Sequence, residues 1–228
     1  MSLDDAIKLL EAVTKLISAL AWPALITFII VKFGPALTDF FQSLGEISVK
    51  GAGFEASAKR KQAEAAAALV AAAAARPNTD QPSSAATSRE TLDLVQESVT
   101  PRLLRKAAQA TVLWVDDRPD NNVYERQSLE ALGVTFVIAT STEEAMEKVR
   151  GSKFNVIISD MGRPPDPRAG YTLLDQLRTD GHNTPFVIYA GSNAVEHKAE
   201  ARKRGALGST NRASELFEYV VQALRTAA

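Results

Sequence analysis

The stretch that decides the fold is Thr111-Val112-Leu113-Trp114-Val115-Asp116-Asp117, in which a short apolar run meets two adjacent carboxylates. A second apolar run, Phe154-Asn155-Val156-Ile157-Ile158-Ser159, is followed by a third carboxylate, Asp160. Short β-rich apolar runs with polar borders are typical of buried strands in a parallel sheet. Ligands of open α/β sheets bind outside the carboxyl ends of the strands, so all three acids are expected in one crevice.

Three carboxylates in one crevice repel one another unless a cation joins them. A set of ligands made only of oxygen favours a hard ion, and Mg²⁺ typically takes one or two carboxylates while keeping waters and a phosphate group. The acidic cluster therefore predicts a Mg²⁺-dependent phosphoryl site.

The chain after residue 110 alternates strand and helix patterns, which predicts a parallel sheet with right-handed crossovers. Ser141 and the two glutamates at 143 and 144 supply a typical helix start. Strands are expected at Val112–Val115, Thr135–Ala139, Val156–Ser159, Phe186–Tyr189 and near Leu207–Ser209. Helices are expected at Asn121–Ala131, Thr142–Arg150, Tyr171–Arg178, Val195–Arg204 and Ala213–Ala227.

The sequence Val115-Asp116-Asp117-Arg118-Pro119, followed by Ile158-Ser159-Asp160-Met161, resembles the CheY-like receiver domain of two-component response regulators. The similarity runs from about Ala110 to Ala227 and continues through Gly170–Leu174, Pro185–Tyr189 and Gly205-Ala206. It implies a flavodoxin-like sheet of five parallel strands in the order 2-1-3-4-5.

The resemblance also implies the roles of the acidic residues. Asp160 would accept a phosphoryl group, and Asp116 and Asp117 would bind Mg²⁺ together with Asp160 and the backbone carbonyl of Gly162. Such an ion offsets the repulsion between an anionic nucleophile and an anionic donor, and positioning with charge neutralisation is most of what phosphoryl transfer needs.

The positions that read out phosphorylation in receivers depart from the family pattern. Ala190 stands where a Thr or Ser hydroxyl is usual, and Ser192 is a possible substitute or a turn serine. Arg212 stands where a lysine is usual and is a candidate phosphate contact, although it is not equivalent to a compact ammonium. The aromatic switch position falls near Ser209, and the usual proline is missing. The switch is therefore expected to be divergent.

The loop Gly162–Gly170 is longer than its counterpart in receivers and carries Arg163 and Arg168 beside the site. Binding of phosphate or of a partner is one interpretation. A solvated loop is the favoured one.

The segment Leu16–Val31 carries no charge and lies between Lys15 and Lys32. As a helix it would span roughly 24 Å, and lysines at both ends can snorkel toward the headgroups. We expect a single transmembrane helix within residues 1–45; a buried helical hairpin in an oligomer is the competing interpretation. Lys and Arg are more numerous after the span, which places the C-terminal side in the cytoplasm of a bacterium, at the inner membrane.

The middle of the chain is expected to connect the membrane to the receiver-like domain. Residues 46–75 are predicted to hold a short strand or hairpin near 47–56 and an Ala-rich helix at Ser57–Ala75, whose small side chains hint at homo-oligomers. Residues 76–109 are predicted to hold a linker, Arg76–Ser88, and a helix from Thr91 to Ala108 broken at Pro101, either a stalk or an extra helix on the receiver. The receiver-like domain is placed at 110–228.

Composition narrows the classes of function. The formal charge of −1 gives no global basic field, so nucleic acid is not an expected partner. The absence of cysteine excludes disulfides, thiolate metal sites and cysteine nucleophiles.

The sequence as a whole predicts a membrane-anchored signalling protein rather than an enzyme. Asp160 would take phosphate from a histidine kinase or phosphotransfer protein, and output would pass by protein contact. The alternative is a pseudo-receiver that is not phosphorylated and acts as a membrane-tethered interaction or oligomerisation module. A Mg²⁺-dependent hydrolase of the haloacid dehalogenase type is disfavoured, because that class needs two aspartates one residue apart and here they are adjacent.

Overall fold

The computed structural model describes residues 52–75, 84–192 and 194–226. By its contacts the chain divides into two compact units, Met1–Ala56 and Ser57–Ala228, and nearly all described residues belong to the second. The membrane span expected at Leu16–Val31 lies outside the described residues. No helix within the described ranges is both long enough and apolar enough to cross a bilayer.

The second unit is built on a five-stranded parallel sheet in the order β2-β1-β3-β4-β5, which confirms the predicted α/β architecture. β1 and β3 are neighbours, and their register pairs Val115 with Ser159, so the residues that follow both strands lie side by side. The strands are β1 (Thr111–Val115), β2 (Thr135–Ala139), β3 (Val156–Ser159), β4 (Phe186–Tyr189) and β5 (Gly208–Thr210).

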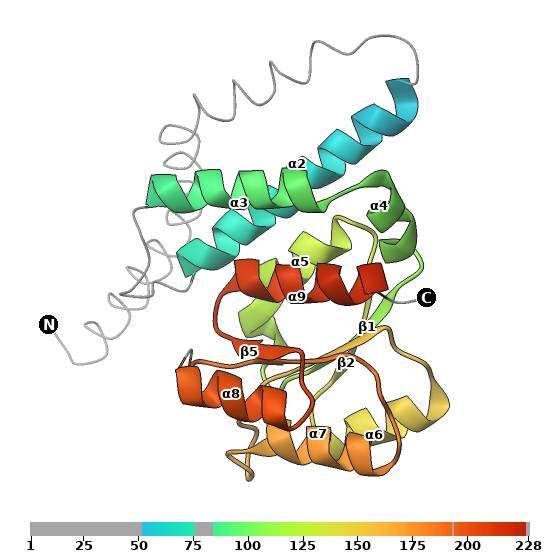
Figure 1. Cartoon of the computed structure of the whole chain (residues 1–228), viewed down its shortest axis with the longest axis vertical. Coiled ribbons are helices and arrows are strands. Elements are labelled where there is room, and N and C mark those ends of the chain that lie inside the picture. The colour runs from blue at the N-terminus through green and yellow to red at the C-terminus, as the bar shows by residue number, and fades with distance from the viewer. Residues whose placement is uncertain (1–51, 76–83, 193, 227–228) are drawn as a thin grey trace, which may run out of the picture. The chain divides into compact units, whose positions relative to one another are not determined.

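Helices cover both faces of the sheet (Figure 1). On one face Trp114 and Ile158 pack in a core with α9, and on the other Leu113 and Ile157 pack in a core with α6 and α7. Because helices cover both faces, the side chains of β1, β3 and β4 are almost all buried, which is why these strands are continuous apolar runs. The elements around the sheet are the 3₁₀ helix η1 (Pro119–Asn122) and the α-helices α5 (Val123–Glu130), α6 (Thr142–Gly151), α7 (Ala169–Thr179), α8 (Val195–Lys203) and α9 (Ala213–Thr226).

A further layer of helices covers α5 and α9: α2 (Ala52–Ala75), α3 (Ser84–Ser98) and α4 (Pro101–Ala107). Leu69 of α2 and Val95 of α3 are buried in the same core as Val220 of α9. Polar contacts join the layer as well, because Gln62 Nε2 donates to the carbonyl of Val99 at 2.9 Å. These helices are therefore part of the domain and not a separate stalk.

The break expected at Pro101 is confirmed. The side chain of Thr100 caps α4 by accepting the N–H of Leu103 at 3.2 Å, and Pro101 takes a first-turn position of α4, where a missing N–H costs nothing.

Two local predictions are wrong. Residues 52–56, expected to belong to a short strand, are helical, because the alanines and long charged side chains that continue from them favour a helix over the local alternation. The linker expected at Arg76–Ser88 is helical from Ser84 onward, since α3 begins there and buries Val95 further along. Residues 76–83 lie outside the described part of the chain.

Candidate functional site

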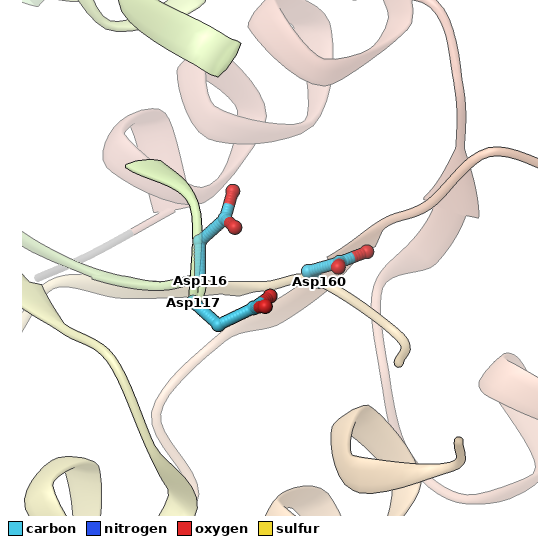
Figure 2. Close-up of side chains that lie close together, drawn as sticks. All are labelled: Asp116, Asp117 and Asp160. Atoms are coloured by element: carbon cyan, nitrogen blue, oxygen red, sulfur yellow. The ribbon is translucent and has the colours of Figure 1, made fainter. Parts of the chain in front are cut away.

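The three predicted acids converge at the carboxyl ends of β1 and β3. One ligand oxygen from each of Asp116, Asp117 and Asp160 lies within 4.8 Å of the others. Figure 2 shows the carboxylates of Asp116 and Asp117 pointing in different directions from adjacent positions, with that of Asp117 directed toward Asp160. The backbone supports this arrangement, because the N–H of Asp160 donates to the carbonyl of Val115 at 2.9 Å.

Asp116 is buried and held by three donors. Its Oδ2 accepts the side-chain amide of Asn122 at 2.5 Å and the indole N–H of Trp114 at 3.4 Å. Its Oδ1 accepts the backbone N–H of Arg118 at 2.8 Å. Sequence reasoning missed Asn122, which a polar residue in the turn just after the acid pair could have suggested. These donors fix the orientation of the Asp116 carboxylate.

Asp117 provides an observation that tests whether a metal ion fits. Its Oδ1 is buried and has no hydrogen-bond partner, while Oδ2 lies 3.6 Å from Nε of Arg118. A buried carboxylate oxygen without a donor is costly, and it lies among the carboxylate oxygens that hard divalent cations prefer. The residues present therefore fit Mg²⁺, with Asp116, Asp117 and Asp160 as the side chains that could hold it.

Asp160, the member of the cluster that follows β3, is half-buried. Burial raises the pKa of its carboxyl, and the charges of Asp116 and Asp117 act in the same direction. The N–H of Met161, which donates to Oδ1 at 2.7 Å, opposes the rise. A divalent cation in the cluster would favour the ionised form of Asp160, because opposite charge nearby stabilises a carboxylate.

The loop that follows Asp160 is closely packed at its end. Gly162, the proposed backbone ligand, is half-buried in this loop. A Cβ added at Gly170 would lie 2.8 Å from the carbonyl oxygen of Asp160, so only glycine lets α7 start so close to the acid. The N–H of Gly170 donates to the carbonyl of Met161 at 2.8 Å.

The favoured interpretation of a solvated loop is wrong for Arg163 and fits Arg168. Arg163 is only 3% exposed, and its guanidinium donates to oxygens from β3 and from the starts of α6 and α7. Arg168 is exposed, and its guanidinium lies over the ring of Tyr171, 5.4 Å from the centroid. A charged residue in a Gly/Pro loop is normally solvated, so only the fold could reveal that Arg163 turns inward.

The predicted readout residues have local partners. Ala190 is buried after β4 and offers no hydroxyl. Ser192 behaves as a turn serine, because its Oγ lies 2.9 Å from Nδ1 of His197 and accepts the N–H of Ala194 at 3.3 Å.

Arg212 is likewise engaged, by the first turn of the helix that follows it. Its Nη1 lies 3.6 Å from Oε1 of Glu215, in the first turn of α9. The same glutamate accepts Lys198 Nζ at 3.0 Å and Thr210 Oγ1 at 2.8 Å. The structure thus brings the three acids together and leaves Ser192 and Arg212 in contacts of their own.

Comparisons with known proteins agree with the similarity seen in the sequence. Residues 112–213 match the family model of the response regulator receiver domain. Over 141 residues, 58% of the chain, it is 26% identical to the sensor histidine kinase GacS of Pseudomonas protegens; the match covers 15% of that kinase.

Solved structures of receivers are similar over about half of the chain. The receiver domain of the Francisella response regulator 1452 is 25% identical with a TM-score of 0.47, over 51% of this chain and 97% of that one. The chemotaxis response regulator CheY4 of Vibrio cholerae is 26% identical with a TM-score of 0.41, over 51% of this chain and 96% of that one.

Proposed function

We propose that the protein is a signalling switch whose Asp160 accepts a phosphoryl group in the presence of Mg²⁺, because residues 112–213 match the family model of the response regulator receiver domain. The observation that carries the proposal is the convergence of three carboxylates, with one buried oxygen of Asp117 lacking a donor. Without a bound cation such a cluster destabilises the folded state, because carboxylates of like charge repel one another and a buried acceptor without a donor is unfavourable. A binding function accounts for its presence.

The proposal assigns metal binding and phosphoryl transfer to particular residues. Asp116, oriented by Asn122, and Asp117 would hold the ion together with Asp160, and the resemblance to receivers adds the carbonyl of Gly162. When bound, Mg²⁺ supplies neutralising charge between the acidic cluster and the anionic donor. A carboxylate oxygen of Asp160 forms a bond to phosphorus while the bond from phosphorus to a donor imidazole nitrogen breaks. The electron pair stays on that nitrogen, which takes up a proton.

The wider setting is part of the same proposal. A histidine kinase or phosphotransfer protein is the expected donor, because the segment is similar to part of a sensor histidine kinase. We propose anchoring through residues 1–45 in the bacterial inner membrane, with residues 110–228 on the cytoplasmic side. Output passes by contact with another protein or a second copy of the chain, without nucleic acid binding and without enzymatic activity.

A second candidate function is favoured by the readout positions. Ala190 has no hydroxyl, and the side chains of Ser192 and Arg212 are held by His197 and Glu215. These contacts support a pseudo-receiver that binds Mg²⁺ without being phosphorylated and acts as a tethered interaction module.

Intact mass spectrometry of the full chain separates the two candidates. The protein would be incubated with Mg²⁺ and a small acyl phosphate, beside Asp160→Asn and a matched control, Asp180→Asn, at an exposed aspartate of the α7 C-cap. We expect a mass gain of one phosphoryl group in the wild type and the control and none in Asp160→Asn. If the wild type gains no mass and also fails to bind beryllofluoride, the phosphorylated switch is wrong and the pseudo-receiver stands.

A further inference from the structure

The guanidinium of Arg163 is a buried cation held mainly by neutral oxygens. Nη1 donates to Ser159 Oγ at 2.7 Å and to the backbone carbonyl of Asp160 at 2.8 Å. Nη2 donates to Thr142 Oγ1 at 3.0 Å and to the carbonyl of Ala169 at 3.1 Å. Among the residues that the structure describes, no ion pair within 4.0 Å includes Arg163.

This environment is unfavourable for a cation unless negative charge lies near. Thr142 is the first residue of α6 and Ala169 is the first residue of α7, so the guanidinium lies at two helix N-termini, whose dipoles disfavour positive charge. Burial lowers the pKa of Arg163, and the charges of Asp160, Asp116 and Asp117 oppose this, in that order. The acidic cluster is therefore what makes a buried arginine tolerable here.

The charges of this group balance with one divalent ion. The three carboxylates carry −3 and the buried Arg163 carries +1, which leaves −2. The charge of Arg118, 3.6 Å from Asp117, is left out of this balance because its side chain is 73% exposed and therefore screened by solvent. Arg212, the cation that the resemblance to receivers would place at the site, is instead paired with Glu215.

We propose that Arg163, and not Arg212, is the fixed cation of the acidic cluster: a positioning residue that holds the backbone of Asp160 and sets the cluster's charge so that one divalent cation neutralises it. Its charge acts through space on the carboxylates, and its hydrogen bonds tie the end of β3 to the starts of α6 and α7. The metal-binding part of this inference stands without phosphorylation; its bearing on catalysis rests on the proposed function.

Mg²⁺ affinity of the full chain tests the charge. The indole N–H of Trp114 donates to Asp116, so Trp114 emission should report the ion once the other tryptophan is replaced by Trp22→Phe. In that background we expect Arg163→Gln to bind Mg²⁺ about tenfold more tightly, since removing a nearby positive charge raises the attraction. Arg163→Lys keeps the charge and should stay within about threefold of the parent. Arg212→Gln, the matched control, should change affinity by less than about twofold, because the Arg212 charge is paired with Glu215.

A purely structural Arg163 would give a different pattern. Arg163→Gln and Arg163→Lys would then both lower the melting temperature without tighter Mg²⁺ binding, and this outcome would overturn the proposal. So would tighter binding in Arg212→Gln but not in Arg163→Gln.

If Arg163→Gln does not fold, an NMR titration of the wild-type protein with Mg²⁺ tests the proposal instead. The Nε–H of Arg163 is buried and has no partner, so its ¹⁵N–¹H signal should be visible and should shift during a Mg²⁺ titration, while that of Arg212 stays in place. An unshifted Arg163 signal overturns the inference. Absence of phosphorylation with a shifted signal would refute only the proposed function.

Discussion

The side-chain amide of Asn122 donates to Oδ2 of Asp116 across 2.5 Å, and both residues are buried. Asn122 ends η1 and immediately precedes α5, whose end is buried in the core that also contains Leu69 of α2. The consecutive elements η1 and α5 therefore connect an acid of the candidate metal site with the core that the N-terminal helices share.

Replacing Asn122 tests whether this contact orients the ligand. In Asn122→Ala the Asp116 carboxylate loses a short donor, so we expect Mg²⁺ affinity to fall about 10- to 100-fold, as for other partners of metal ligands. The matched control is Asn121→Ala at the neighbouring exposed position. Isothermal titration with Mg²⁺ measures both, and equal affinities for the two variants would refute the orienting role.

Replacing Tyr189 tests how much a buried polar contact between β4 and α5 contributes to stability. Its hydroxyl donates to Oε1 of Glu125 at 2.7 Å, and both residues are 3% exposed. Tyr189→Phe leaves a buried carboxylate with one donor fewer, so we expect the free energy of unfolding to fall by about 1–3 kcal/mol. Urea unfolding measures the loss, with Tyr124→Phe at a half-buried tyrosine as the control. A loss no larger than that of the control would contradict the prediction.

Leu69 tests whether α2 belongs to the folded domain. It is 2% exposed in the main core, so Leu69→Ala should lower the free energy of unfolding by about 2–4 kcal/mol. Ala67→Ser, at an exposed position of the same helix, should change it by no more than about 0.5 kcal/mol. Thermal unfolding followed by near-ultraviolet circular dichroism measures both. An unchanged Leu69→Ala protein would mean that α2 does not pack on the domain in solution.

Glu144 gives a prediction on pH. Its Oε2 accepts the N–H of Thr140 at 2.7 Å, and this bond, followed by that from Lys148, lowers the pKa of Glu144 to about 2. A carboxyl whose pKa is lower in the folded state stabilises above its unfolded pKa, near 4.5, and the contribution disappears as pH falls toward about 2.

Glu144→Gln should therefore be less stable than the wild type at pH 7, by about 1 kcal/mol or less because the side chain is partly exposed. The difference should narrow between pH 5 and pH 3 in urea unfolding. Glu147→Gln, on the exposed side of the same helix, is the control. A difference that stays constant with pH would refute the role of the Glu144 charge.

The local sequence was sufficient to predict the sheet and the acidic cluster. Buried parallel strands need apolar residues on both faces, so β1, β3 and β4 can be read directly from continuous runs. The acids follow because the carboxyl ends of adjacent parallel strands meet at one edge, as Val115 and Ser159 do in the register. The alanine at position 190, directly after β4, could likewise be read from the sequence.

Only the tertiary structure decided which polar side chains lie beside the acidic cluster. Arg163 lies in a loop of glycine and proline where a charge is normally solvated, and its burial depends on oxygens that β3, α6 and α7 bring together. Arg212 stands at the sequence position where receivers carry a lysine. The direction of its side chain, however, is set by the ion pair with Glu215, one helical turn further on. Spacing along a sequence fixes where a backbone position falls in a regular sheet, whereas the direction of a long side chain depends on partners that only folding brings within reach.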